Sequence, residues 1–215
     1  ITEEAIEDNL YDRLASRYTK ALARSMANAK QVKAVNPLIN GLPTTDGYDS
    51  GDGVSLFSTS HPTLNGVFSN TLDTQADLNE TSLEQSLIDI GEMTDERGLL
   101  IAAKGVKMII PPENQFNAER LTKSQGRTGT ADNDINAINS MGMIPQGYRV
   151  NNYLTDNDSW YLITDVPNGM KMFVRAPLNT AMEGDFDTGN VRYKARERYS
   201  FGVSDYRGIF GVEGT

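Results

Sequence analysis

A helical spacing of apolar residues over the first 36 positions constrains the fold more than any other feature of the chain. Most of these residues recur every fourth position and the last two every third, which is a helical period and not the alternation of a strand. They are Ile6, Leu10, Leu14, Tyr18, Leu22, Met26, Ala29 and Val32. The spacing predicts one long helix over residues 2–36.

Both ends of this helix carry the expected signals. Thr2 is a favourable N-cap, and Asn36-Pro37 is expected to end the helix because the residue before a proline is pushed out of the helical region. The helix would be on the order of 50 Å long, and its four-residue repeat makes the apolar stripe wind around it. Two interpretations stay open: an ordinary core helix, or a spine shared with neighbouring elements or subunits.

Composition places the chain among soluble globular proteins of one large or two small domains. It has 215 residues, of which 38% are hydrophobic and 23% charged, and no apolar run approaches the ~20 residues of a membrane span. The absence of cysteine excludes disulfides, thiolate metal sites and cysteine nucleophiles, and it fits synthesis in a reducing cytoplasm. A net charge of -9 repels phosphate backbones, so we expect no stable DNA or RNA complex.

The remaining segments predict an α+β protein with segregated elements, not a doubly wound parallel sheet. Residues 38–79 are rich in Gly, Asp, Ser, Thr and Asn, which is typical of a functional loop or of a surface covered by another chain. Helices are expected from the capping-box sequence Thr81-Ser82-Leu83-Glu84 to about Met93, and over 113–123 with Phe116 and Leu121 facing inward. Strands are expected over 54–58, 67–69, 106–110, 148–152, 160–164, 172–175 and 191–201.

Two details of the expected strands bear on function. Asn168-Gly169 lies between two of them and is typical of a hairpin turn. In the last run the positions alternate between a mostly apolar face and a basic face. The basic face consists of Arg192, Lys194, Arg196 and Arg198.

His61 is the single histidine and the first candidate for catalysis. It lies in Phe57-Ser58-Thr59-Ser60-His61-Pro62, but a neighbouring serine in sequence is not the geometry of a catalytic triad, which also needs a third group and an oxyanion site. We therefore expect a histidine that packs in a loop.

The acidic and glycine-rich loops give only weak metal and nucleotide signals. Asp46, Asp49 and Asp52 could bind calcium, and Asp132-Asn133-Asp134-Ile135-Asn136 copies the start of an EF-hand loop, although Ala137 and Met143 replace its required Gly and Glu. Gly51-Asp52-Gly53 and Gly126-Arg127-Thr128-Gly129 lack the residues and spacing of dinucleotide and phosphate loops. A pair of carboxylates for glycoside hydrolysis stays open, because its separation is spatial. We expect no catalytic, cofactor or metal residues.

Several stretches, in this order, resemble a known family. Besides the N-terminal helix they are Leu56-Phe57-Ser58-Thr59-Ser60-His61-Pro62, Thr94-Asp95-Glu96-Arg97-Gly98, Met108-Ile109-Ile110-Pro111-Pro112, Trp160-Tyr161-Leu162 and Tyr206-Arg207-Gly208-Ile209-Phe210-Gly211. Together they resemble the major capsid proteins of tailed bacteriophages with the Hong Kong 97-type fold, and within them the Mu-type major head subunit.

The resemblance implies a structural protein without enzymatic activity or cofactors. Its fold would be a peripheral domain of residues 1–105 with the spine helix, completed by 190–215, and an axial domain of residues 106–189. The subunit would form hexamers and pentamers of an icosahedral shell that encloses DNA without reading its sequence, with decoration, scaffold and portal proteins as further partners and no membrane. It would be made in the bacterial host cytoplasm and located in the virion.

The resemblance also implies an N-terminal arm and an extended loop before the spine helix. Because the chain begins with Ile1, we expect the full gene product to continue upstream. Leu14→Asp or Leu22→Asp should abolish soluble assembly, Arg13→Gln should matter little, and residues 124–134 should lie near the capsomer axis. The alternatives are an encapsulin-like compartment shell and, from another class, a monomeric hydrolase or a sugar-binding β domain.

Overall fold

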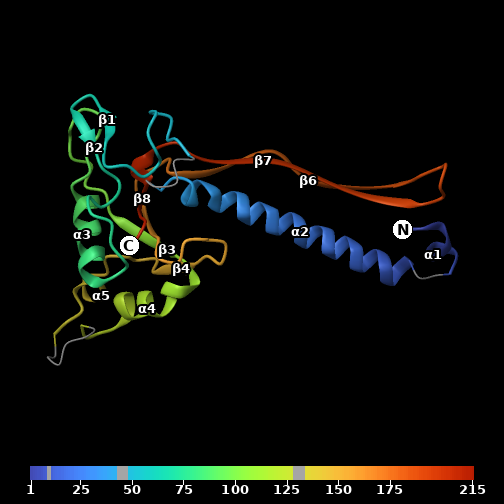
Figure 1. Cartoon of the computed structure of the whole chain (residues 1–215), viewed down its shortest axis with the longest axis horizontal. Helices are drawn as coiled ribbons and strands as arrows, with labels where there is room; N and C mark the ends of the chain where they lie inside the picture. Colours follow the sequence, from blue (N-terminus) through green and yellow to red (C-terminus); the bar gives the residue numbers. More distant parts are fainter. Residues whose placement is uncertain (9–10, 43–47, 128–133) are drawn as a thin grey trace. The chain divides into compact units, whose positions relative to one another are not determined.

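The computed structural model is a mixed α+β structure (Figure 1), as the order of elements predicted. It describes residues 1–8, 11–42, 48–127 and 134–215, with the backbone alone over 11–14. The helices are α1 (Glu3–Glu7), α2 (Tyr11–Ile39), α3 (Glu80–Gly91), α4 (Gln115–Lys123) and α5 (Ala137–Ser140), with 3-10 turns η1 (Pro112–Asn114) and η2 (Tyr206–Gly208). The strands are β1 (His61–Thr63), β2 (Gly66–Phe68), β3 (Gly105–Ile110), β4 (Tyr148–Val150), β5 (Trp160–Thr164), β6 (Met170–Gly184), β7 (Val191–Val203) and β8 (Ile209–Val212).

The chain divides into two compact units. Unit 1 consists of Ile1–Ala34 and Met172–Phe201, and unit 2 of Val35–Lys171 and Gly202–Thr215. These boundaries differ from those of the expected peripheral and axial domains. Because those domains are defined by positions in an assembled shell, their assignment stays a prediction.

Unit 2 is built around a four-stranded sheet in the order β4-β3-β5-β8. β3 runs parallel to β4 and antiparallel to β5, and β5 runs antiparallel to β8. Since successive side chains of a strand point to opposite faces, the sheet carries two sets of core residues. One face holds Met108, Ile110, Trp160, Leu162, Phe210 and Val212, and the other holds Ile109, Tyr161 and Ile209.

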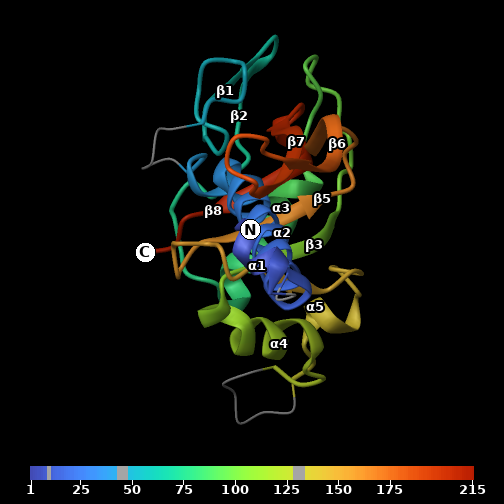
Figure 2. The same cartoon turned by 90° about the vertical axis from the view of Figure 1, so that its right-hand side faces the viewer.

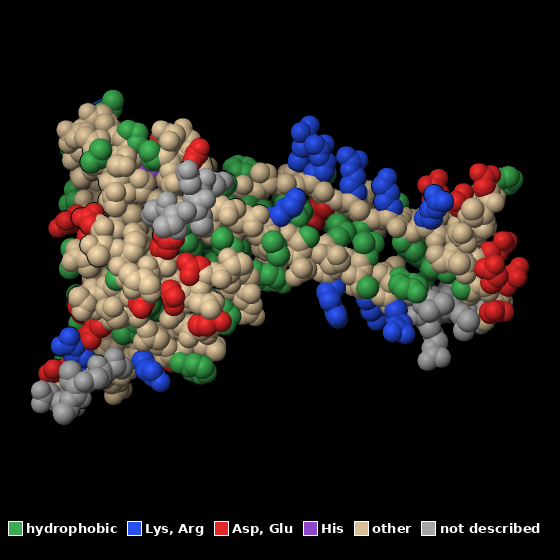
Figure 3. Space-filling view, in the orientation of Figure 1, with side chains coloured by type: hydrophobic (Ala, Val, Ile, Leu, Met, Phe, Trp, Pro, Cys, Tyr) green, Lys and Arg blue, Asp and Glu red, His purple; other side chains and the backbone are tan. Residues whose placement is uncertain are grey.

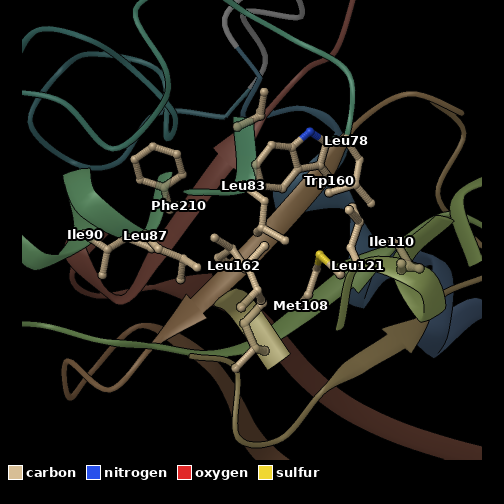
Figure 4. Packing of buried hydrophobic residues seen from close by; sticks show 14 of the residues in the cluster. Leu78, Leu83, Leu87, Ile90, Met108, Ile110, Leu121, Trp160, Leu162 and Phe210 are labelled. Atoms are coloured by element: carbon tan, nitrogen blue, oxygen red, sulfur yellow. The ribbon is translucent and has the colours of Figure 1, made fainter. Parts of the chain in front are cut away.

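Helices cover the first face of the sheet, where the larger core lies (Figure 4). Leu83, Leu87 and Ile90 of α3 are buried there, which confirms the predicted stripe. The helix begins two residues earlier than predicted, because Asn79 and Ser82 form the capping box: the Asn79 side chain accepts from Ser82 N at 2.9 Å.

α4 and α5 complete this cover and lie side by side (Figures 1 and 2). Asn136, the N-cap of α5, donates from its side chain to the carbonyl of Leu121 in α4 at 2.8 Å. Leu121 is buried as predicted. Phe116 is 69% exposed, so the prediction that it faces inward was wrong. It lies five residues before Leu121, about 140° away around the helix.

The end of α2 packs on the second face of the sheet. Val35 and Leu38 are buried there with Phe57 and Tyr161, whose hydroxyl donates to Leu38 O at 3.3 Å. The predicted stop at Pro37 was wrong, because the helix continues to Ile39. Proline at this position removes only one hydrogen bond from the last turn of the helix. The hydrogen bond from Asn40 N to Asn36 O at 2.9 Å remains, and burial of the neighbouring apolar side chains stabilises the turn.

Glycine allows the close packing of this second core. A Cβ atom on Gly211 of β8 would lie 2.6 Å from the ring of Phe57, closer than van der Waals contact permits.

Residues 54–58 belong to no strand. Ser55 makes an isolated bridge to Asp49, and the small sheet of this region is the antiparallel pair β1–β2. The strand prediction for 54–58 was therefore wrong.

Unit 1 contains α1, most of α2 and the long hairpin of β6 and β7 (Figure 1). The sequence predicted one helix where the structure has two, and Leu10 and the Leu14 side chain lie outside the described residues. The hairpin closes at Asp185–Asn190, where Asp185 N donates to Asn190 O at 2.8 Å. Asn168 has the positive φ of a turn, 71°, but this turn joins β5 and β6, which belong to different sheets, so it is not a hairpin turn.

Candidate assembly surfaces

His61 is the centre of a buried polar cluster in unit 2. Its ring is 0% exposed and stacks on Tyr206 with ring centroids 4.0 Å apart. Nδ1 lies 2.7 Å from Asp52 Oδ2, and Nε2 lies 3.0 Å from Asn70 Oδ1. Both ring nitrogens therefore have partners, and neither partner is Ser58 or Ser60. The arrangement fits a histidine that packs in the core.

Asn70 orients this histidine, and sequence reasoning missed it. Its side-chain nitrogen donates to Leu56 O at 2.8 Å, and its oxygen accepts from Ser58 N at 2.9 Å. These backbone groups fix which way the amide points, so His61 must donate to Asn70 from Nε2. Nδ1 lies against the Asp52 carboxylate, so both sides of the ring are held in place.

Asp52 belongs to this cluster. Burial alone would raise the pKa of its carboxyl, but hydrogen bonds from Ser50, His61 and Val54 N outweigh burial and lower the pKa below 3.8. Asp49 lies in the bridge to Ser55, and Asp46 lies outside the described residues. Across the described side chains of 1–8, 15–42, 48–127 and 134–215, no three acidic or histidine side chains are grouped to hold a metal.

The other candidate loops are only partly described. Asp132, Asn133, Thr128 and Gly129 lie outside the described residues. Asn136, the fifth position of the EF-hand-like sequence, uses its side chain as the cap of α5 and as a donor to Leu121 O. That side chain has a structural role.

A groove of about 700 Å³ lies beside α3 in unit 2. Asp73, Asp89 and Glu92 line it. Burial raises the pKa of the Asp89 carboxyl, a hydrogen bond from Gln85 opposes this rise, and the charges of Asp73 and Glu92 add to it. The groove is acidic, but the described residues place no nucleophile–base pair in it.

Unit 1 has no buried residue among those whose side chains are described. Tyr18 is 63% exposed and Leu22 37%, although both belong to the predicted apolar stripe of the helix. Phe173, Val174, Leu178 and Met182 of β6 are each more than half exposed. A two-stranded hairpin and a helix without a core are marginal alone, so these apolar surfaces are suited to cover by other chains.

Within unit 1, a groove of about 410 Å³ lies between the stripe and β7, lined by Tyr18, Leu22 and Tyr193 among others. The predicted alternation of β7 is confirmed except at Tyr193: the basic residues are exposed and Val191, Ala195, Glu197 and Tyr199 are half-buried, but Tyr193 of the expected apolar face is 40% exposed. Lys30 of α2 pairs with Glu197 and lies over the Tyr199 ring, 5.1 Å from its centroid. The apolar face of β7 therefore faces its own helix, and the basic side chains are exposed.

Unit 1 thus shows exposed apolar surfaces and no buried residue among its described side chains, and His61 in unit 2 is closed off from solvent. None of the helices in the described residues has the length and hydropathy of a membrane span. A family model described as phage capsid protein matches residues 1–212. The chain belongs to this phage capsid protein family.

One solved capsid structure shares the fold of this chain. The capsid of Myoviridae phage XM1 is 15% identical, with a TM-score of 0.56, over 99% of this chain and 69% of that chain. A virus-like particle from Pyrococcus furiosus is 10% identical (TM-score 0.43, 66% of this chain and 55% of that chain), and Mycobacterium phage Che8 is 16% identical (TM-score 0.48, 92% and 63%). No curated protein sequence matches the chain. At these identities the XM1 likeness shows a shared fold alone, and this chain spans only part of each of those proteins.

Proposed function

We propose that the chain is the major capsid subunit of a tailed phage, that it has the Hong Kong 97-type fold, and that it assembles into an icosahedral shell. The observation that carries the proposal is the lack of buried residues among the described side chains of unit 1, in a chain that belongs to a phage capsid protein family. Its exposed stripe and hairpin need partners, and in a closed shell the partners are other copies of the chain. The role is structural and not catalytic.

The proposal includes the domain assignment. Residues 1–105 with the spine helix, completed by 190–215, form the peripheral domain, and 106–189 form the axial domain. The 29-residue length of α2 and its exposed apolar stripe support the role of a spine, and the resemblance to the Mu-type head subunit gives the order of domains.

The axial domain gives a separate test at residues 124–134, of which 128–133 lie outside the described residues. We expect copies of this segment to meet around the axis of each hexamer or pentamer. The chain has no cysteine, so Thr128→Cys with a short bifunctional thiol linker reports on this segment alone. Denaturing gels of intact particles should show ladders to five and six subunits, whereas monomers with a reactive thiol would place the segment elsewhere.

The shell would enclose the phage genome without sequence-specific contacts, for which a subunit of net charge -9 is suited. The subunit would be synthesised in the host cytoplasm and reside in the virion, with scaffold, portal and decoration proteins as further partners. An encapsulin-like compartment shell is less favoured, because the matching family is one of phage capsids. The hydrolase and sugar-binding alternatives have no observation in their favour.

Purified full-length gene product tests the proposal directly. Light scattering and negative-stain microscopy should show closed particles of uniform size, and the same particles should be recovered from infected or induced cells with DNA inside. A product that stays monomeric over a wide range of concentration and salt, both alone and with its neighbouring phage proteins, would contradict it.

A further inference from the structure

The charge of this protein is strongly segregated. Unit 1 carries 11 Lys and Arg against 9 Asp and Glu, a net charge of +2, and the rest of the chain carries 9 against 20, a net charge of -11. Unit 1 is divided further. We call residues 1–8 and 183–190 the tip, and residues 15–34, 172–182 and 191–201 the shaft.

The tip is acidic and the shaft is basic. The tip has seven acidic residues and no Lys or Arg: Glu3, Glu4, Glu7, Asp8, Glu183, Asp185 and Asp187. The shaft has ten basic residues and one acidic residue, Glu197: Arg17, Lys20, Arg24, Lys30, Lys33, Arg175, Arg192, Lys194, Arg196 and Arg198. Figure 3 shows the Lys and Arg side chains in rows along unit 1 and the Asp and Glu side chains gathered at the end with α1.

The N-terminal segment of the tip is held against the hairpin, at Asn190 of the tip and at Val191, the first residue of the shaft in β7. Ile1 N donates to Val191 O at 2.8 Å, Val191 N donates to Ile1 O at 2.9 Å, and Glu3 N donates to Asn190 Oδ1 at 3.2 Å. These bonds bring the carboxylates of α1 next to those of the hairpin turn. All seven are exposed except Asp185, which is half-buried.

The tip of a copy leaves most of the charge of its own shaft unpaired. Among the described residues, only two shaft cations have ion-pair partners: Lys30 with Glu197, and Arg192 with Asp185 of the tip. Residues on the same face of a strand are about 6.7 Å apart, so Arg198 lies about 26 Å along β7 from the tip. The Debye length at physiological salt is about 8 Å, so the tip charge is screened at that distance.

We propose that the acidic tip of one copy binds the basic shaft of the next copy in the shell, a deepening that rests on the proposed function. The tip carries seven negative charges on 16 residues, a far higher density than the net -11 spread over the 151 residues of unit 2. It is therefore the surface of this chain that best complements the shaft. Each copy gives one tip and receives one, so the contact is head-to-tail and closes by rotation into a ring. Duplex DNA fits less well, because a copy that docks on it brings a net charge of -9.

Charge reversal with rescue tests the contact in the full gene product. Arg196→Glu with Arg198→Glu reverses part of the shaft, and Glu3→Lys with Glu4→Lys reverses part of the tip. Each pair should raise the subunit concentration needed for assembly about tenfold or more, because attraction becomes repulsion, and all four changes in one chain should return it to within about threefold of the native value. Particles of the native chain should also weaken as salt rises from 0.1 to 1 M, where the Debye length falls from about 10 to about 3 Å.

A matched control separates local from overall charge. Arg97→Glu with Arg149→Glu makes the same change in net charge on exposed residues of unit 2 and should leave assembly as it is. The proposal would be overturned if this control lost assembly as much as the shaft or tip pair. It would also be overturned if the chain with all four changes assembled as poorly as each pair alone. If the shaft variant still assembles but its particles contain no DNA, the shaft binds DNA instead.

Cross-linking tests the same contact without substitutions. Particles assembled from isotopically labelled and unlabelled copies are treated with a carbodiimide, which joins lysine amines to carboxylates in direct contact. Lys20, Lys33 or Lys194 of one copy should join to tip carboxylates of the other. If these lysines form cross-links only to unit 2, or form no cross-links, the tip–shaft contact is refuted. If the native chain forms no particles at all, the proposed function is refuted instead.

Discussion

Asn70→Ala should destabilise unit 2 more than its small change in volume suggests. The side chain is 0% exposed, and its oxygen accepts from Ser58 N at 2.9 Å and from His61 Nε2 at 3.0 Å. Neither donor has another hydrogen-bond partner in the described structure. Alanine therefore leaves two donors unsatisfied, and each costs about 1–3 kcal/mol when water cannot reach it.

The expected loss in the free energy of unfolding is about 4 kcal/mol, a large part of the 5–15 kcal/mol that stabilises a typical domain. At roughly 2–4 °C per kcal/mol for a domain of this size, the melting temperature should fall by about 10 °C. Trp160 is the single tryptophan and is 0% exposed on the other face of the sheet, so its fluorescence reports unfolding without touching the site.

Asn114→Ala is the matched control. Its side-chain amide donates to Asn157 O at 3.2 Å in an exposed position, so its loss should cost less than about 1 kcal/mol. Urea unfolding of both variants, at a concentration below that of assembly, gives the comparison. Equal midpoints for the two variants would refute the view that Asn70 organises the His61 cluster.

Three further predictions follow from other features. The pKa of Asp52 is lower in the folded than in the unfolded state, so its ionised carboxylate stabilises the fold above the unfolded pKa near 3.8, and this stabilisation is lost as the pH falls through the folded pKa. Asp52→Asn should therefore flatten the pH dependence of urea unfolding below about pH 4. Leu22→Asp should leave Trp160 fluorescence native but prevent particle formation, because Leu22 is 37% exposed in unit 1, while Leu22→Met, which keeps an apolar side chain, should assemble; particles from the Leu22→Asp variant would show that the stripe is not part of the interface. Hydrogen exchange in unassembled subunits should be fast in β6 and β7 and slow in β3 and β5, and assembly should slow it in unit 1; equal protection before assembly would contradict this.

The parts of the fold that a short-range pattern encodes could be predicted from the sequence. β5 was predicted with its observed bounds, since Trp160 to Thr164 is a short apolar run that the centre of a sheet buries on both faces. The stripe of α3 and the alternation of β7 were predicted for the same reason. Phe116 was assigned to the wrong face, although its angular distance from Leu121 on the helix could have shown the error.

The polar core could not be predicted. Asn70 lies in Ser69-Asn70-Thr71, which has neither periodicity nor a motif, and its partners include Tyr206 and Ile209, 136 and 139 residues away. The prediction that α2 ends at Pro37 was wrong for a related reason. The local rule ends a helix before proline, but burial of Val35 and Leu38 against distant residues extends this one. In both cases long-range packing decides against the local signal.

The two units use apolar residues in opposite ways. Unit 2 covers both faces of its sheet and has a complete core, whereas the described side chains of unit 1 include none that is buried. Ordering a helix and a 15-residue strand costs conformational entropy that exposed side chains do not offset. We infer that neighbouring subunits supply this offset, so that ordering of unit 1 and growth of the shell are coupled, and the hydrogen-exchange contrast between the units measures that coupling. A charged shaft and tip would then select the correct neighbour before the apolar surfaces close, because charge acts at longer range than apolar contact.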